Sequence, residues 1–262
     1  MNGMVEIGTD GAADGSDGTD DSTVAAYRSE PPVSVGAIRG ALIVVHEVWG
    51  LVDHIKDVAD RFAAEGYLVL APDLLASLGP SPSEIDELRT AMQNPDPAAR
   101  TAIQPRLREI MTPLSSPEFS AAALAQLRSC VDVLLAEPGV DSRVGIVGFC
   151  FGGTQSYSLA VHEPRLRAAV PFYGHADYPV AALAGIRCPI QAFYGENDAR
   201  LMGQLPEFRE RMREAGVDFR AEVFADCGHA FFNDTNPSSY NAQASAQAWR
   251  QTLAFLAEAL SE

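Results

Sequence analysis

Positive charge is scarce in this chain of 262 residues, which has 19 lysine and arginine side chains against 35 aspartates and glutamates. The formal net charge is −16, and Lys56 is the only lysine. An acidic surface of this kind repels nucleic acids and anionic membrane surfaces. We therefore expect neither of them as a partner, and we expect a small molecule to be what the protein binds.

Long apolar runs are also missing. None reaches the roughly 20 consecutive residues that a membrane-spanning helix needs. The first residues lack the basic-then-apolar profile of a signal peptide. The apolar content of 47% is nevertheless that of a globular protein with a sizeable core. These features together predict a globular protein without a membrane segment.

Cysteine is rare, and its four residues are Cys130, Cys150, Cys188 and Cys227. No two of them form a CxxC pair, and a chain of this length does not need disulfides to fold. We therefore expect free thiols in a reducing, cytoplasmic environment. The dipeptide His46-Glu47 is not followed by the second histidine of the zinc-protease helix motif. We expect neither a metal ion nor another cofactor.

What the sequence does contain is a regular alternation of apolar runs and helical patterns. Strands are expected over 41–46, 67–70, 143–149, 166–172, 190–194 and 219–224. Helices are expected over 50–65, 119–135, 202–215 and 238–260. This alternation predicts βαβ units and a mostly parallel sheet of about eight strands, with helices on both faces. Because no second core, repeat or linker is visible, we predict a single α/β domain over residues 1–262.

Two segments depart from this alternation. Within residues 1–30, two short strands over 4–8 and 23–28 flank an acidic stretch, which indicates either a hairpin with a long loop or a disordered tail. The apolar residues of the second strand favour the hairpin. Residues 75–117 contain seven prolines, with short helices expected near 83–93 and 98–111. This segment leaves the ligand-binding end of a strand, so it is either a lid-like pocket wall or a solvent-covering insertion.

The strand over 143–149 ends in the sequence GFCFGG (148–153), and residues 154–161 have helical character. Strand, sharp turn and helix match the nucleophile elbow of α/β-hydrolases, with Cys150 in place of the usual serine. The glycines permit the strained turn, and the helix N-terminus stabilises a thiolate or an oxyanion beside the Phe151 N–H. A buried structural cysteine is the alternative for this motif taken alone.

Two further residues suited to activating a nucleophile follow later strands. Asp198 and His229 come after predicted strands, in the order nucleophile, acid, histidine that α/β-hydrolases share. Because parallel strands end along one edge of a sheet, these side chains can meet there. An imidazole can take the thiol proton, and a carboxylate can orient the imidazole. His175 and Asp226 follow strands as well and are rivals for the base and the acid.

Five segments resemble those of dienelactone hydrolases, the carboxymethylenebutenolidase family. They are HEVWG (46–50), APDL (71–74), GFCFGG (148–153), GENDA (195–199) and GHAFF (228–232). The resemblance extends over the chain after about residue 22. It implies an α/β-hydrolase that cleaves a small ester or lactone through an acyl-thioester intermediate. It also implies a catalytic triad of Cys150, Asp198 and His229.

The resemblance implies further roles around Cys150. Glu47 matches a glutamate that contacts the resting cysteine and takes its proton as the substrate arrives. Such an arrangement would protect the thiol, because a permanently ionised and exposed thiolate is easily oxidised. The backbone N–H groups of Val48 and Phe151 match the oxyanion hole, whose donors stabilise the developing negative charge.

The substrate-binding positions depart from the family pattern. The family binds its substrate carboxylate with two arginines, and this chain has Ser77 and Asn233 at those positions. Trp49 is a further candidate substrate contact. We therefore expect a neutral ester or lactone, with Arg200 as the first alternative cation. A thioesterase or acyl transferase, and a non-catalytic ligand-binding or redox-sensing protein of the same fold, are the alternatives to this function.

Overall fold

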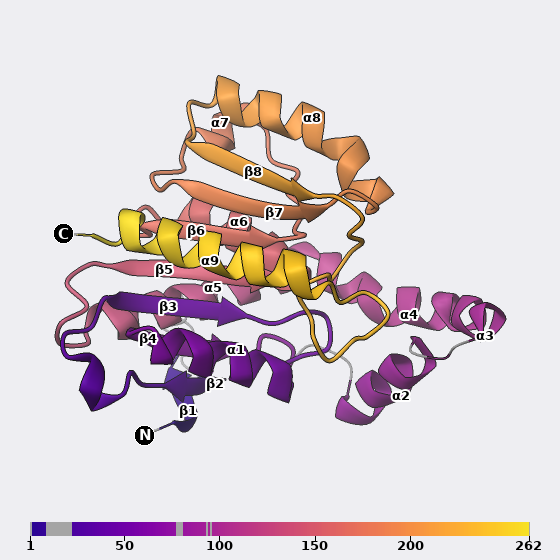
Figure 1. The fold of residues 1–262 in the computed structure, drawn as a ribbon, viewed down its shortest axis with the longest axis horizontal. Helices are drawn as coiled ribbons and strands as arrows, with labels where there is room; N and C mark the ends of the chain where they lie inside the picture. The colour runs from indigo at the N-terminus through magenta and orange to yellow at the C-terminus, as the bar shows by residue number, and fades with distance from the viewer. Residues whose placement is uncertain (1, 9–22, 77–80, 93, 95, 262) are drawn as a thin grey trace, which may run out of the picture.

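The computed structural model describes residues 2–8, 23–76, 81–92, 94 and 96–261. Its strands are β1 (Gly3–Gly8), β2 (Thr23–Ser29), β3 (Gly40–Val45), β4 (Tyr67–Pro72), β5 (Val144–Phe149), β6 (Ala168–Phe172), β7 (Ile190–Gly195) and β8 (Phe219–Phe224). Within these ranges they form one eight-stranded sheet with the order β1-β2-β4-β3-β5-β6-β7-β8 (Figure 1). The pairs β1–β2 and β2–β4 are antiparallel, and all pairs from β4 to β8 are parallel. The predicted mostly parallel sheet is confirmed.

The burial of the strands explains why the sequence shows continuous apolar runs. Every residue of β3, β4, β5 and β6 is buried, because helices cover both faces of the central sheet. Strand β8 is only partly buried along most of its length. It lies at the edge of the sheet, as its weaker and partly alternating pattern predicted.

The main helices are α1 (Asp53–Ala64), α5 (Pro117–Leu135), α6 (Phe151–His162), α7 (Val180–Leu183), α8 (Ala199–Glu214) and α9 (Ala242–Ala259). Helices α1 and α9 share one face of the sheet, where the rings of Phe62 and Trp249 lie 4.4 Å apart (Figure 1). Helices α6 and α8 share the opposite face, where Tyr157 contacts Phe208. Helix α7 was not predicted, because four residues are too few to show a helical period. No helix in the described ranges is both long and apolar enough to cross a membrane.

The proline-rich segment forms short helices beyond the carboxyl ends of the strands (Figure 1). They are α2 (Pro82–Met92), α3 (Pro97–Ala102), α4 (Gln104–Met111) and the 3₁₀-helix η2 (Thr112–Ser115). The prediction of one helix over 98–111 is wrong, because the chain breaks at Ile103 between α3 and α4. Pro105 has no N–H with which to continue the hydrogen bonds of α3, but it fits the first turn of a new helix.

The N-terminal strands form an antiparallel pair whose register runs from Gly3 opposite Arg28 to Gly8 opposite Thr23. The pair is attached to the domain through Asp60 of α1, whose carboxylate accepts hydrogen bonds from the hydroxyls of Tyr27 and Ser29. The acidic stretch between the two strands lies in residues 9–22, outside the described residues.

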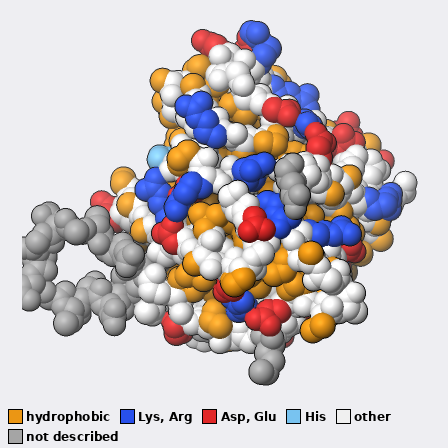
Figure 2. All heavy atoms as spheres, turned by 90° about the vertical axis from the view of Figure 1, so that its left-hand side faces the viewer, with side chains coloured by type: hydrophobic (Ala, Val, Ile, Leu, Met, Phe, Trp, Pro, Cys, Tyr) orange, Lys and Arg blue, Asp and Glu red, His pale blue; other side chains and the backbone are white. Residues whose placement is uncertain are grey.

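Several basic side chains lie at the amino ends of the strands. Figure 2 shows the face formed by the amino ends of the strands, where lysine and arginine side chains spread across the middle. Arginines directly precede several neighbouring strands, namely Arg39 before β3, Arg143 before β5 and Arg167 before β6. Arg39 and Arg167 are exposed, and Arg143 is half-buried. These cations therefore lie at the end of the sheet opposite the carboxyl ends, where Cys150 is located.

Candidate active site

Cys150 occupies a sharp turn between β5 and α6. Its backbone has φ 54° and ψ −107°, a conformation that non-glycine residues rarely adopt and that costs energy to maintain. The flanking glycines permit this turn through close packing. A Cβ atom at Gly148 would lie 2.0 Å from the carbonyl oxygen of Gly152, and one at Gly152 would lie 2.2 Å from that of Val45. The turn therefore has the geometry of a nucleophile elbow.

The side chains of Cys150, His229 and Asp198 form a continuous hydrogen-bonded chain. His229 Nε2 lies 3.0 Å from Cys150 Sγ, and His229 Nδ1 lies 2.5 Å from Asp198 Oδ2. Asp198 follows β7 and caps the N-terminus of α8, where its Oδ1 accepts a hydrogen bond from the Leu201 N–H. The fold thus brings together three residues that lie far apart in the sequence, at the carboxyl edge of the sheet.

The two rival residues are located elsewhere. His175 lines a separate cavity of about 160 Å³, together with Asp177 and Arg211. Asp226 lies in the turn after β8, where its backbone N–H donates to Glu196 at 3.5 Å. His229 and Asp198 are therefore the histidine and the carboxylate that connect to Cys150.

The charges of the histidine and the aspartate are coupled. Burial disfavours the imidazolium, but the hydrogen bonds to Asp198 and Cys150 outweigh burial and raise the pKa of His229 to about 10. Burial likewise opposes ionisation of Asp198, but the bond to His229 dominates and lowers the pKa of this carboxyl. The two groups therefore favour an imidazolium next to a carboxylate near neutral pH.

The four cysteines differ in their exposure. Cys130, Cys188 and Cys227 are buried, whereas Cys150 is half-buried. Burial raises the pKa of the Cys130 and Cys188 thiols to about 12, and it also raises the pKa of Cys227. Because the thiolate is the reactive form of cysteine, burial protects these three thiols from electrophiles.

Glu47 lies two residues after the end of β3 and is 3% exposed. Its Oε2 accepts a hydrogen bond of 2.6 Å from Asn233 Nδ2, and its Oε1 accepts one of 3.3 Å from the Tyr173 hydroxyl. Burial raises the pKa of Glu47, and the hydrogen bond from Asn233 opposes this rise. Among the described residues, no hydrogen bond joins Glu47 to Cys150, and the thiol lies 3.0 Å from His229 Nε2. The transfer of the thiol proton to Glu47, which the resemblance implies, therefore stays a prediction.

His46 supports the elbow in a way that the sequence did not indicate. Its Nδ1 donates to the Glu47 carbonyl at 2.6 Å, and its Nε2 accepts from the Leu74 N–H at 3.1 Å. Burial lowers the pKa of His46, so the ring is neutral and its tautomer is fixed by these two bonds. The ring stacks on Phe151, and the His46 carbonyl accepts a bond from the Gly152 N–H. His46 thus ties the ends of β3 and β4 to the turn at Cys150.

Two backbone N–H groups are the candidate oxyanion donors. Phe151 is the first residue of α6, and Val48 follows Glu47 in the loop after β3. Neither backbone N–H donates to another group in the described part of the chain. Free N–H groups at a helix N-terminus and in an adjacent loop suit the binding of an oxyanion.

Trp49 lines two neighbouring cavities that α2 covers. One, of about 410 Å³, has apolar walls that include Leu75 and Ile85. The other, of about 230 Å³, is lined by Arg89 and Asn233. Ser77 lies outside the described residues, and the Asn233 side chain binds Glu47.

A cation that the sequence did not indicate lies beside the smaller of these two cavities. Arg89, on α2, lines the smaller cavity and forms an exposed ion pair of 3.1 Å with Asp86. Arg200 is exposed, and its contact with a substrate stays a prediction; burial lowers the pKa of His175, and the charge of Arg200 lowers it further. No sequence motif marked Arg89, because its place beside the crevice depends on how the proline-rich segment folds.

Comparison with known proteins agrees with this geometry. A sequence profile of the dienelactone hydrolase family matches residues 24–260. A provisionally named carboxymethylenebutenolidase of Saccharolobus solfataricus is 31% identical over 229 residues, which cover 82% of this chain and 88% of that protein. A similarly named protein of Salmonella typhimurium is 29% identical over 89% of this chain and 82% of its own length.

Solved structures show the same relationship. The crystal structure of a provisionally named dienelactone hydrolase from Klebsiella pneumoniae superposes with a TM-score of 0.76, at 26% identity, and covers 98% of this chain and 99% of that one. A dienelactone hydrolase-like promiscuous phosphotriesterase from metagenomic libraries has a TM-score of 0.72 at 22% identity, with 98% of each chain covered, which supports the fold alone. The chain has the α/β-hydrolase fold, is a hydrolase and belongs to the dienelactone hydrolase family.

Proposed function

We propose that this protein hydrolyses a small ester or lactone with Cys150 as the nucleophile, His229 as the general base and Asp198 as the carboxylate that orients the histidine. The observation that supports this proposal most directly is the continuous chain from Asp198 through His229 to Cys150, with distances of 2.5 Å and 3.0 Å. A non-catalytic binding protein would gain nothing from a buried carboxylate behind a histidine that contacts a thiol.

The first half of the reaction acylates Cys150. The sulfur attacks the substrate carbonyl carbon while His229 holds the thiol proton, and the carbonyl oxygen becomes an oxyanion. The N–H groups of Val48 and Phe151 stabilise that oxyanion. When the carbon–oxygen bond to the leaving group breaks, His229 gives its proton to the departing alkoxide, which leaves as an alcohol, or as a hydroxyl of the opened ring in a lactone.

The second half regenerates the thiol. A water molecule gives a proton to His229 and attacks the thioester carbonyl, and the same two N–H groups stabilise the second oxyanion. The carbon–sulfur bond then breaks, the carboxylic acid is released and the proton returns to Cys150. Asp198 keeps the imidazole in place through both halves, because its bond to Nδ1 leaves Nε2 directed at the reacting atoms.

Alkylation with iodoacetamide tests the nucleophile. We expect Cys150 to be labelled first and activity toward a chromogenic acetyl ester to fall in proportion to that labelling, because the other three thiols are buried. Peptide mass spectrometry measures the labelling at each cysteine. An excess of substrate that acylates Cys150 should slow the modification. Loss of activity with Cys130, Cys188 or Cys227 modified and Cys150 intact would contradict the assignment.

We further predict a preference for neutral substrates. The kcat/KM value for a neutral p-nitrophenyl acyl ester should exceed that of its ω-carboxylate isostere by about tenfold, since a buried carboxylate needs charged partners to replace its hydration. The Asn233 amide nitrogen binds Glu47, and a net charge of −16 slows the approach of anions. Initial rates corrected for spontaneous hydrolysis measure the ratio.

A higher kcat/KM for the carboxylate ester than for the neutral ester would contradict this prediction. If the wild type prefers the carboxylate ester, the inference of a neutral substrate is wrong, and Arg89 is the first cation to test because it lines the cavity beside Asn233. The Arg89→Gln variant would then lose the preference. Arg106→Gln is the matched control, because Arg106 belongs to the same proline-rich segment but forms exposed ion pairs with Glu84 and Glu109.

A further inference from the structure

Glu47 is a buried carboxylate whose two oxygens are both held by hydrogen-bond donors. Asn233 Nδ2 is 2.6 Å from one oxygen, and the Tyr173 hydroxyl is 3.3 Å from the other. All three residues are at least nine-tenths buried, with 3% exposure for Glu47, 5% for Asn233 and 1% for Tyr173. Hydrogen-bond donors stabilise the charged, accepting form of a carboxylate, whereas burial disfavours it.

Thr235 fixes the orientation of the Asn233 amide by binding its oxygen, the atom that does not face Glu47. The Thr235 backbone N–H donates to Asn233 Oδ1 at 3.0 Å, and the Thr235 hydroxyl donates to the same oxygen at 2.7 Å. A backbone N–H can only donate, so the atom that faces Thr235 must be the amide oxygen. The amide nitrogen is therefore the atom that faces Glu47.

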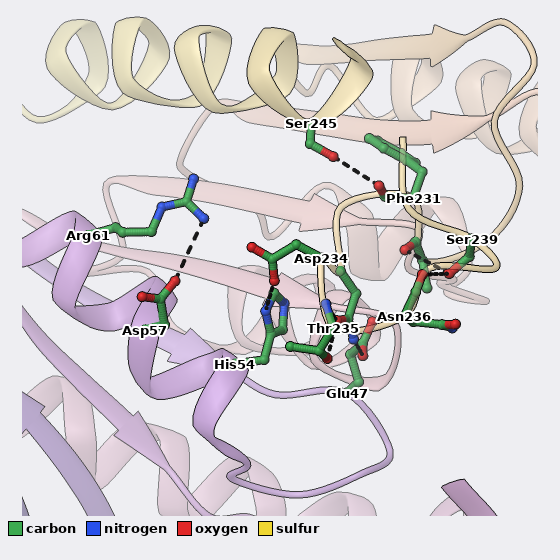
Figure 3. Close-up of polar contacts among 12 residues, drawn as sticks. Glu47, His54, Asp57, Arg61, Phe231, Asp234, Thr235, Asn236, Ser239 and Ser245 are labelled. Atoms are coloured by element: carbon green, nitrogen blue, oxygen red, sulfur yellow. Dashed lines mark hydrogen bonds and ion pairs between the residues drawn. The ribbon is translucent and has the colours of Figure 1, made fainter. Parts of the chain in front are cut away.

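The loop that holds this amide is itself attached to two helices. Figure 3 shows the Asp234 carboxylate facing the ring of His54 on α1, at a distance of 3.0 Å from His54 Nδ1. Further along the chain, the hydroxyl of Ser245 on α9 donates to the Phe231 carbonyl at 2.9 Å. These contacts place Asn233 in a loop with little freedom to move away from Glu47.

We propose that Asn233 is a positioning residue, which fixes the Glu47 carboxylate against Tyr173 and leaves the Cys150 thiol to pair with His229. The inference rests on the proposed function and changes the role of Asn233, which the sequence had indicated as a substrate contact. In this role, Asn233 acts on the reaction through Glu47. The hydrogen bonds of Thr235 make this role specific to the amide, because a side chain without an acceptor at Oδ1 could not be held in the same orientation.

The pKa of Glu47 depends on its hydrogen bond from Asn233 and on the titratable groups around it. The titratable groups that face Glu47 are Tyr173 at the end of β6, His229 in the loop after β8 and His54 on α1. Burial raises the pKa of Glu47, and the hydrogen bond from Asn233 is the largest effect that opposes it. Removal of that bond should therefore raise the pKa of Glu47 further.

The Asn233→Leu variant tests the proposal. Nuclear magnetic resonance of protein labelled with ¹³C at the glutamate carboxyl follows the titration of Glu47, whose signal is identified by its absence in Glu47→Gln. We expect the titration midpoint of Glu47 to rise by about one unit in Asn233→Leu, as is typical when a carboxylate loses a hydrogen-bond donor. The measurement needs no turnover, so it stands whether or not the Cys150 mechanism is correct.

Asn236→Leu is the matched control. Asn236 lies in the same loop and its Oδ1 accepts bonds from Ser238, as Asn233 does from Thr235, but it has no bond to Glu47. We expect no shift of the Glu47 titration in this variant. An unchanged midpoint in Asn233→Leu, or an equal shift in Asn236→Leu, would overturn the proposal. If Asn233→Leu fails to fold, Thr235→Val, which removes only the hydroxyl, should still give a smaller upward shift, and no shift there would also overturn it.

Discussion

Replacement of Cys150 by alanine should reduce kcat for ester hydrolysis by at least about 10⁴-fold, as is common when a covalent nucleophile is removed. The reason is that no other group in the site can form the acyl intermediate. His229 would remain beside Asp198, but its proton would have no sulfur to come from. The proposed oxyanion donors, the backbone N–H groups of Val48 and Phe151, would be retained, so a small rate above the uncatalysed reaction should persist.

The same substitution should leave the fold intact. Alanine keeps the Cβ atom, so the strain of the backbone at φ 54° does not change, and the only bond lost is that from His229 to the half-buried sulfur. Thermal unfolding followed by circular dichroism should give a Tm close to that of the wild type. Cys227→Ala is the control for loss of a thiol, since Cys227 is buried and free. Activity of Cys150→Ala within tenfold of wild type would exclude Cys150 as the nucleophile.

Much of the fold could be predicted because the central strands are buried on both faces. Runs such as ALIVV at β3 and VGIVGF at β5 are apolar at every position, and turns and helices separate them clearly. The positions after the strands then indicated Cys150, Asp198 and His229, because parallel strands place their carboxyl ends along one edge. These predictions depend on apolar runs and on the alternation of strands and helices along the chain, both of which can be read from the sequence.

What the sequence could not give are contacts between distant residues with no pattern of their own. The hydrogen bond from Asn233 to Glu47 joins residues 186 positions apart, and that from Tyr173 to Glu47 joins residues 126 positions apart. Whether Glu47 meets the thiol or the amide depends on distances that no spacing rule fixes. Arg89 was missed for the same reason, since the path of the proline-rich segment decides which of its side chains reach the crevice.

The proposed triad predicts how substitutions of its members combine in their effects on kcat. In the proposed mechanism, His229 acts on Cys150 and Asp198 acts through His229, so the loss of one member should remove most of what the other two contribute. Asp198→Asn is a suitable variant, because asparagine can still cap α8 at the Leu201 N–H while the negative charge next to His229 is lost. His229→Ala removes the base itself.

We expect each of these single variants to lower kcat by about 10³–10⁴-fold, which is the usual range for members of such triads. The double variant Asp198→Asn/His229→Ala should be slower than His229→Ala by no more than a few-fold, whereas independent contributions would multiply to a loss of about 10⁶–10⁸-fold.

Acylation measured with enzyme in excess over a p-nitrophenyl ester gives the rates without interference from slow deacylation. Losses that multiply would show that Asp198 and His229 act separately, and the triad would have to be abandoned. His175→Ala serves as the control for the rival base and should stay within a few-fold of wild type, because its ring lies in the separate cavity beside Arg211.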